Sequence, residues 1–180
     1  GDDDNDTVLD DSDRCSRGVT GWTPSADNDA NGNGCRDADE DGDDDTDGVL
    51  DGADRCALGV AGWTSSAAFD HDGDGCKDDD LEDLDDDNDG VVDASDLCVQ
   101  GATGWLSATV VDHDADGCQD AGEDVDDDND GVADGSDACG TGATGWLSDA
   151  STDHDGNGCR DANEDGDRDG IFDSVDLCSM

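Results

Sequence analysis

The residues with the clearest capacity for chemistry are aspartates set at alternate positions around a glycine. In the stretch Asp85–Asp96, carboxylates occupy positions 1, 3, 5, 9 and 12 of twelve, and Gly90 occupies position 6. Alternate carboxylates can point inward at one ion, the glycine permits a sharp turn, and position 7 offers a backbone carbonyl. Hard oxygen ligands in this order are typical of a calcium loop, so the pattern predicts bound calcium.

Five stretches of this kind, which we call the A loops, occur along the chain, and each is followed two residues later by a cysteine. Their predicted metal ligands are Asp2, Asp4, Asp6, Asp10 and Asp13; Asp43, Asp45, Asp47, Asp51 and Asp54; Asp85, Asp87, Asp89, Asp93 and Asp96; Asp126, Asp128, Asp130, Asp134 and Asp137; and Asp165, Asp167, Asp169, Asp173 and Asp176. Thr7 replaces the glycine of position 6 in the first A loop, and we expect it to strain or weaken that site.

Four further acidic stretches, the B loops, alternate with the A loops and carry glutamate near position 12, where calcium loops place a bidentate ligand. Their predicted ligands are Asp29, Asn31, Asn33, Asp37 and Glu40; Asp70, Asp72, Asp74, Asp78 and Glu82; Asp112, Asp114, Asp116, Asp120 and Glu123; and Asp153, Asp155, Asn157, Asp161 and Glu164. In the second B loop Leu81 occupies position 12, and Glu82 is the predicted substitute.

The A loops end in aspartate, which reaches less far than glutamate, so they are expected to need ligands from neighbouring loops. Asp41, Asp83 and Asp124 lie between a B loop and the next A loop and are the candidates. Ions would then be shared between loops or bound in pairs, and nine loops is a lower bound on the number of sites.

These loops repeat with a period of about 41 residues, which indicates a tandem array. Cys15, Cys56, Cys98, Cys139 and Cys178 mark one phase of the repeat, and Cys35, Cys76, Cys118 and Cys159 follow their predecessors by 20 residues. A tryptophan lies seven residues after each of the first four cysteines, at Trp22, Trp63, Trp105 and Trp146. The predicted repeats are 1–40, 41–82, 83–123 and 124–164, with a partial repeat at 165–180.

The composition leaves calcium and disulfides to replace an apolar core. The 180 residues include 55 acidic and 7 basic side chains, for a formal charge of −48, while aromatic residues make up 3%. Without cations such a chain should expand by self-repulsion. No amphipathic run of helical length follows any loop, which excludes the paired helices of an EF-hand. The predicted fold is an elongated array of calcium-wrapped, disulfide-stapled repeats with little regular secondary structure.

The same features exclude several classes of function. The negative charge excludes ordinary nucleic-acid binding, and no apolar run is long enough for membrane insertion. An active site is a singular feature, whereas every polar group here belongs to a repeat, so we do not expect an enzyme.

Nine cysteines indicate an oxidising compartment, hence an extracellular or cell-surface location. Zinc would compete as an explanation, but the chain has no C-x-x-C pair. His71, His113 and His154 at position 2 of B loops are expected to be solvated.

The A loop with its trailing cysteine, D-x-D-x-D-G-x-x-D-x-x-D-x-C, resembles the thrombospondin type 3 repeat, as does its alternation with a loop carrying cysteine just after the glycine, at Asp116-Gly117-Cys118. The resemblance covers essentially the whole chain and implies an extracellular, calcium-wrapped string. It also implies disulfides between consecutive cysteines, namely Cys15–Cys35, Cys56–Cys76, Cys98–Cys118 and Cys139–Cys159. The Gly-Trp segments depart from the animal pattern and look more like microbial surface versions that serve as stalks or spacers.

Some assignments stay open at the level of sequence. The alternative disulfide register, from Cys35–Cys56 onward, leaves Cys15 unpaired in place of Cys178. Cys178 either has lost its partner by truncation or bonds to another subunit. Each tryptophan either covers a disulfide and the apolar residues of an A loop, with Leu50, Val92 and Phe172 in that position, or contacts a neighbouring unit or subunit.

The expected function is that of an extracellular calcium-binding structural repeat, acting as a stalk, a spacer or a fibre subunit. The alternatives are a calcium-dependent adhesive or self-assembling module, with copies of the chain as its partner, and a soluble calcium reservoir or matrix protein.

Overall fold

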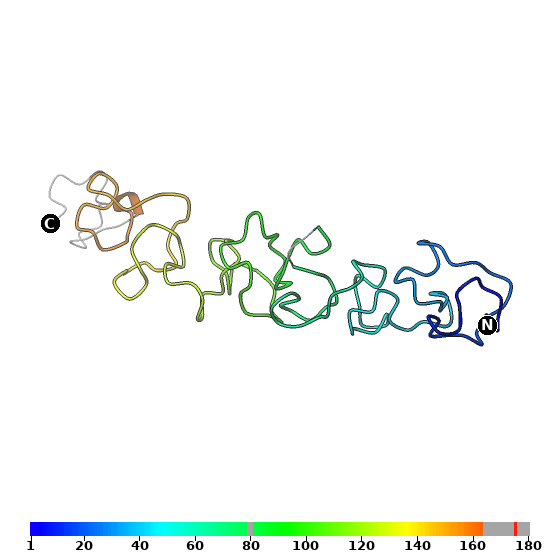
Figure 1. Cartoon of the computed structure of the whole chain (residues 1–180). Coiled ribbons are helices and arrows are strands. Elements are labelled where there is room, and N and C mark those ends of the chain that lie inside the picture. Colours follow the sequence, from blue (N-terminus) through cyan, green and yellow to red (C-terminus); the bar gives the residue numbers. More distant parts are fainter. Residues whose placement is uncertain (79–80, 164–174, 176–180) are drawn as a thin grey trace. The chain divides into compact units, whose positions relative to one another are not determined.

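The computed structural model of the chain describes residues 1–78, 81–163 and 175. The chain divides into two compact units, Gly1–Asp86 and Asp87–Met180, whose trace is drawn in Figure 1. The division falls inside the third A loop, so that Asp85 belongs to the first unit and the other predicted ligands of this loop, from Asp87 onward, belong to the second.

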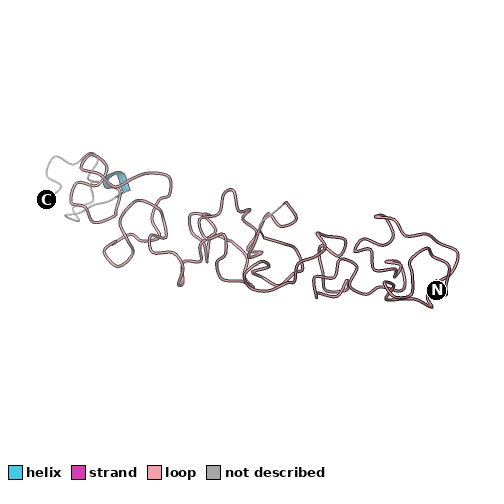
Figure 2. Ribbon diagram, in the orientation of Figure 1, coloured by secondary structure: helices cyan, strands magenta, loops and turns pink. Residues whose placement is uncertain are grey.

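Regular secondary structure is nearly absent from both units. Within the described residues the only regular element is η1, a 3-10 helix over Asp161–Asn163, and every other segment is loop or turn (Figure 2). The same residues contain no helix that is long and apolar enough to cross a membrane. The predicted fold class, stapled repeats with little helix or strand, is confirmed.

Aspartate side chains take the place of a helix or strand ladder as hydrogen-bond partners of the backbone. A carboxylate oxygen accepts from the backbone N–H two residues later, a turn that aspartate forms readily. At position 5 of the A loops, Val8 N–H donates to Asp6 Oδ1, Val49 N–H to Asp47 Oδ1 and Val132 N–H to Asp130 Oδ1, each at 2.7 Å. The acidic spacing therefore determines the backbone path as well as the charge.

Four disulfides connect the first four A loops to the B loops of the same repeats. They join Cys15 to Cys35, Cys56 to Cys76, Cys98 to Cys118 and Cys139 to Cys159, each with a sequence separation of 20. These are the pairs implied by the thrombospondin type 3 resemblance. The alternative register, which would join Cys35 to Cys56, is not the one adopted. Cys178 lies outside the described residues.

A glycine at position 6 of each B loop lets the disulfide bring the two loops together. Gly117 has φ +90°, and a Cβ at this residue would lie 2.1 Å from Oδ1 of Asp96, the last ligand of the A loop. Equivalent overlaps occur at Gly34, Gly75 and Gly158. Only glycine has both the backbone conformation and the lack of a side chain that this contact requires.

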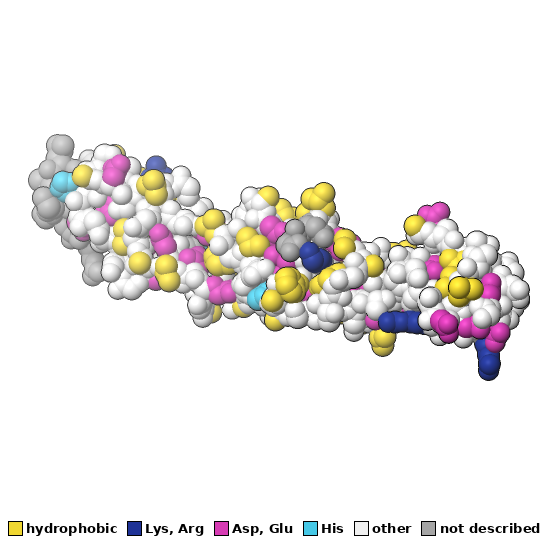
Figure 3. All heavy atoms as spheres, viewed as in Figure 1, with side chains coloured by type: hydrophobic (Ala, Val, Ile, Leu, Met, Phe, Trp, Pro, Cys, Tyr) yellow, Lys and Arg dark blue, Asp and Glu magenta, His cyan; other side chains and the backbone are white. Residues whose placement is uncertain are grey.

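The interior of the described residues is made of carboxylates rather than apolar side chains. The buried hydrophobic residues are the four B-loop cysteines, whereas the fully buried large side chains are all aspartates: Asp6, Asp45, Asp47, Asp70, Asp87, Asp89, Asp112, Asp128 and Asp130. Apolar side chains lie instead on the surface, as the face drawn in Figure 3 shows.

One of the two alternatives for the tryptophans, a small apolar core with the residues at position 8 of the A loops, is not supported where it can be checked. Leu50 is 65% exposed and Val92 is 50% exposed, so neither is buried in such a core. The A loop turns positions 1, 3, 5 and 12 inward, which leaves position 8 facing outward. Phe172, the third residue of this set, lies outside the described residues.

Candidate metal centres

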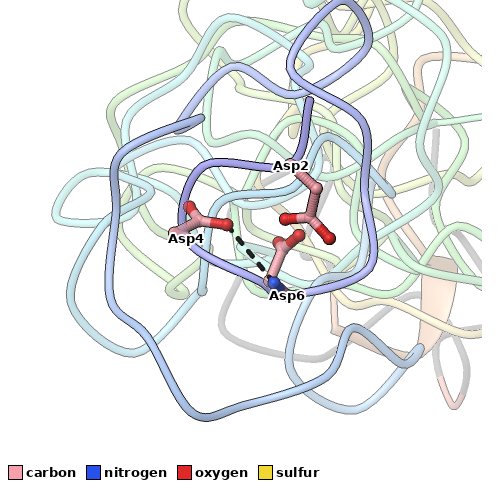
Figure 4. Close-up of side chains that lie close together, drawn as sticks. All are labelled: Asp2, Asp4 and Asp6. Atoms are coloured by element: carbon pink, nitrogen blue, oxygen red, sulfur yellow. Dashed lines mark hydrogen bonds between the residues drawn. The ribbon is translucent and has the colours of Figure 1, made fainter.

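The first three ligand positions of an A loop converge on one point. One oxygen from each of Asp2, Asp4 and Asp6 lies within 4.8 Å of the others. Figure 4 shows the three side chains directed toward the inside of the loop. Asp43, Asp45 and Asp47 of the second A loop form the same kind of group. The predicted ligands at positions 1, 3 and 5 are therefore brought together in these two loops.

The carboxylates at positions 5 and 12 of the first A loop divide their two oxygens between the backbone and the interior of the loop. Asp6 Oδ1 accepts the N–H of Val8, and Asp13 Oδ1 accepts the N–H of Cys15 at 2.7 Å. The second oxygen of each, Oδ2, is buried and has no hydrogen-bond partner. The same buried, unpartnered Oδ2 recurs at positions 5 and 12 of two later loops, in Asp47, Asp54, Asp130 and Asp137.

Buried oxygens without a donor require something positive. An unpaired buried carboxylate costs several kcal/mol, and the described part of the chain has too few basic side chains to pair so many. A cation held by the cluster of Asp2, Asp4 and Asp6 would give a partner to the unpartnered oxygens of Asp2 and Asp6, and Asp13, whose Oδ2 is also unpartnered, is close enough to feel the charge of Asp6. The donors are all oxygen, which suits a hard divalent ion such as calcium or magnesium rather than zinc. The residues present thus fit the kind of ion that their spacing predicts.

Thr7 occupies the strained position expected from the sequence. Its φ is 90°, close to the 99° of Gly48 and the 94° of Gly131 at the same position of later A loops. A β-branched residue is a genuine outlier in this region of backbone space. The first A loop therefore retains the fold of the others at a cost in backbone energy.

The B loops collect their ligands differently, because position 1 is already well bonded by the protein. In the second B loop Asp70, Asp72 and Asp74 converge, with one oxygen from each lying within 4.8 Å of the others. Asp70 nevertheless accepts from the N–H of Gly73 at 2.8 Å and from the hydroxyl of Ser65. Ser107 and Ser148 bond Asp112 and Asp153 in the same way. These serines recur two residues after a tryptophan, a signal that sequence reasoning missed.

The glutamate that ends a B loop also bonds to the backbone of its own repeat. Glu40 Oε1 accepts the N–H of Val19, and Glu123 Oε1 accepts that of Ala102, both at 2.5 Å. A Cβ on Gly59 would lie 2.9 Å from Glu82 Oε1, and Cβ atoms on Gly18 and Gly101 would likewise approach Glu40 Oε1 and Glu123 Oε1. Glu82 therefore takes the place of the other two glutamates, as the one-residue insertion predicted.

A second type of acidic cluster lies between loops. Asp37, Asp41 and Asp44 bring one oxygen each within 4.8 Å of the others, and Asp78, Asp83 and Asp86 do the same in the next repeat. Asp41 and Asp83 were predicted as shared ligands from their place in the sequence.

The third member of each inter-loop cluster was not predicted. Asp44 and Asp86 are at position 2 of A loops, which the calcium-loop pattern leaves unassigned, although aspartate recurs there in four of the five A loops. Asp44 is 8% exposed, and its Oδ1 has no hydrogen-bond partner. The clusters support the expectation that each loop draws on its neighbour.

Crowding raises the pKa of several of these carboxyl groups. Burial, followed by the charges of Asp37, Asp51 and Asp41, raises the pKa of Asp44 to about 6. Burial and then the charges of neighbouring aspartates raise the pKa of Asp127, the equivalent residue of the fourth A loop, to about 6 as well. Both effects disfavour the charged form.

These pKa shifts predict opposite effects of pH on the calcium-free and the calcium-bound chain. Between the ordinary pKa of 3.8 and the raised value of about 6, the folded state holds more protons than the unfolded state. Without calcium, the folded state should therefore become still less favourable relative to the unfolded state as pH rises through this window. Protons compete with cations for the same oxygens, so the calcium concentration at half-saturation should rise when pH is lowered from about 7 to about 5.

Calcium titrations followed by tryptophan fluorescence at the two pH values, at constant ionic strength, would measure this. Equal midpoints at both pH values would contradict the assignment of these carboxylates to cation binding.

Other predicted residues have separate outcomes. His113 Nε2 lies 2.9 Å from the carbonyl oxygen of Gly142, so this side chain is not simply solvated as expected. His154 is exposed, and His71 is partly buried.

Trp146 is half-buried, and Arg160 lies over its ring at 5.9 Å from the centroid. Glu164 and the ligands of the fifth A loop, Asp165, Asp167, Asp169, Asp173 and Asp176, lie outside the described residues.

A scan against protein-family models found no matching family, and a search of curated proteins found no match. The likeness to the thrombospondin type 3 repeat thus rests on the loop pattern of the chain itself.

Proposed function

We propose that the chain is an extracellular calcium-binding structural repeat protein of the thrombospondin type 3 kind, which acts as a stalk, a spacer or a fibre subunit. The single observation that carries the proposal is the recurring buried carboxylate oxygen without a donor at positions 5 and 12 of the A loops. Calcium accepts many oxygen ligands with flexible geometry, and it is abundant outside cells, where disulfides persist.

A structural role follows from how the ions would be used. Apart from four cysteines, the described residues bury no apolar side chains that could order the backbone, so calcium would provide that order by cross-linking loops that otherwise repel one another. The same elements recur in every repeat, which suits a length-setting module better than a catalyst. Four disulfides within single repeats support the same role, because each repeat is closed by its own covalent link.

The first test compares two charge-matched substitutions in one A loop. Asp6 is fully buried with Oδ2 unpartnered, whereas Asp11, at position 10, is exposed. Asp6→Asn should weaken calcium binding at this loop by about tenfold, or about 1.4 kcal/mol, because it removes one charged ligand. Asp11→Asn removes the same charge from the surface and should change the affinity much less.

The measurement is the calcium dependence of the Val8 backbone amide resonance, because this N–H donates to Asp6. If the two variants and the unmodified chain titrate at one calcium concentration, Asp6 is not a ligand. If the unmodified chain shows no calcium-dependent change, the proposed function fails altogether.

A further inference from the structure

Side-chain amides connect the first repeat to the second. We call this contact, between positions 3 and 5 of a B loop and the start of the next repeat, joint 1, and the equivalent contact after repeat 3 joint 3. Asn31 Nδ2 donates to Asp41 Oδ2 at 3.1 Å and to Thr46 Oγ1 at 2.7 Å. Asn33 Nδ2 donates to the same oxygen of Asp41 at 2.7 Å. Asn31 and Asn33 are positions 3 and 5 of a B loop, where the sequence pattern predicts metal ligands, yet here both present donors to a carboxylate.

Backbone contacts determine which way these two amides face. Asn33 Oδ1 accepts the N–H of Cys35 at 2.7 Å, and Asn31 Oδ1 accepts the N–H of Asn33 at 3.0 Å. The oxygen of an amide can be told from its nitrogen only by such partners. Since both oxygens already accept from N–H groups of the loop, the NH₂ groups are the ones that face Asp41.

The third repeat makes the same joint with donor and acceptor exchanged. Positions 3 and 5 of its B loop are Asp114 and Asp116, and the amide comes from the other side: Asn129 Nδ2 donates to Asp114 Oδ2, and to Asp116 Oδ2 at 2.8 Å. Asn129 and Thr46 are both position 4 of the A loop that follows, with φ values of 52° and 65°. Both joints thus have hydrogen bonds between the B loop and the next repeat, but the B loop donates at joint 1 and accepts at joint 3.

The charge at the two joints differs. Asp37 and Asp44 cluster with Asp41 at joint 1, but positions 3 and 5 of the B loop add no charge there, because Asn31 and Asn33 are neutral and donate to Asp41. At joint 3 these positions do add charge, because Asp114 and Asp116 face the charge of Asp124 in place of that of Asp41. An amide NH₂ group donates hydrogen bonds but carries no charge. The single amide of Asn129 therefore leaves three negative charges close together, whereas the two amides at joint 1 supply the hydrogen bonds that one carboxylate oxygen can accept.

We propose that the amide groups of Asn31 and Asn33 take the place of a calcium ion at the joint between repeats 1 and 2. The B loop of repeat 1 then keeps its conformation without an ion at this position, while the B loop of repeat 3 requires one. The inference rests on the calcium binding proposed above and corrects the assignment of Asn31 and Asn33 as ligands.

Two reciprocal variants of the full chain test this inference. Asn31→Asp/Asn33→Asp/Thr46→Asn gives joint 1 the residues of joint 3, and Asp114→Asn/Asp116→Asn/Asn129→Thr does the reverse. The number of calcium ions bound at saturation is measured by equilibrium dialysis with elemental analysis, and disulfide formation is checked by mass spectrometry. The first variant should bind one ion more than the unmodified chain, and the second should bind one ion fewer.

An unchanged number of ions in either folded variant overturns the inference, even if the unmodified chain binds calcium as proposed. If the first variant fails to form its disulfides, the second decides alone. An unmodified chain that binds no calcium refutes the proposed function itself, an outcome distinct from equal binding by all three chains.

Discussion

Excess EDTA is expected to unfold the chain while leaving its disulfides intact. The hydrodynamic radius should increase, and the backbone amides that bond to loop carboxylates, such as those of Val8 and Val132, should lose their protection from hydrogen exchange. Size-exclusion chromatography and hydrogen exchange with and without calcium would measure both effects.

The size of this effect follows from what is buried. Asp6, Asp47 and Asp130 are fully buried, with one oxygen each that the protein leaves without a donor. Removing the partner of a buried charge destabilises a fold by about 3–5 kcal/mol, and folded domains are stable by only about 5–15 kcal/mol. Losing the ion from even a few loops should therefore exceed the stability of the whole fold.

A control with salt separates bound ions from a diffuse ionic atmosphere. About 1 M NaCl shortens the Debye length to about 3 Å and screens exposed charges, but it does not supply a ligand to a buried oxygen. Salt alone should therefore not refold the chelated chain, whereas added calcium should. An unchanged hydrodynamic radius in excess EDTA, or refolding by NaCl alone, would contradict the role given to calcium.

Much of the architecture could be predicted because it depends on spacing. Carboxylates two residues apart converge on one point. The spacing of the cysteines left two disulfide registers open, and the four disulfides formed are those that the thrombospondin type 3 resemblance implied. Even the displaced glutamate of the second B loop, Glu82, could be placed from a one-residue insertion. The same reasoning led to little regular structure, because aspartate competes with helix for the backbone N–H groups.

The features that spacing did not predict depend on which way a side chain faces. The role of Asp44 in an inter-loop cluster requires that position 2 of one loop meet position 9 of the preceding loop, a contact in space rather than in sequence. The exposure of Leu50 follows from the inward turn of its neighbours. The donors presented by Asn31 could not be anticipated, because an amide at a ligand position can equally offer its oxygen.

The disulfides should contribute the second large term to stability, and Cys98→Ser/Cys118→Ser tests it in one repeat. This disulfide closes a segment with a sequence separation of 20, and its loss should lower the free energy of unfolding in saturating calcium by about 3 kcal/mol. Burial adds to the effect, because Cys118 is 6% exposed and belongs to the only buried hydrophobic group of the described residues.

Opening this disulfide should also affect the metal centre beside it. The link holds Gly117 against Asp96, the last ligand of the A loop, so calcium affinity at that loop should fall together with stability. Urea unfolding in saturating calcium gives the free energy. The calcium dependence of the backbone amide at position 98, which donates to Asp96 Oδ1 in the unmodified chain and is kept by serine, gives the affinity. Cys178→Ser, outside the four pairs, is the matched control and should change neither quantity. Equal stability of the double variant and this control would show that calcium alone holds the two loops together.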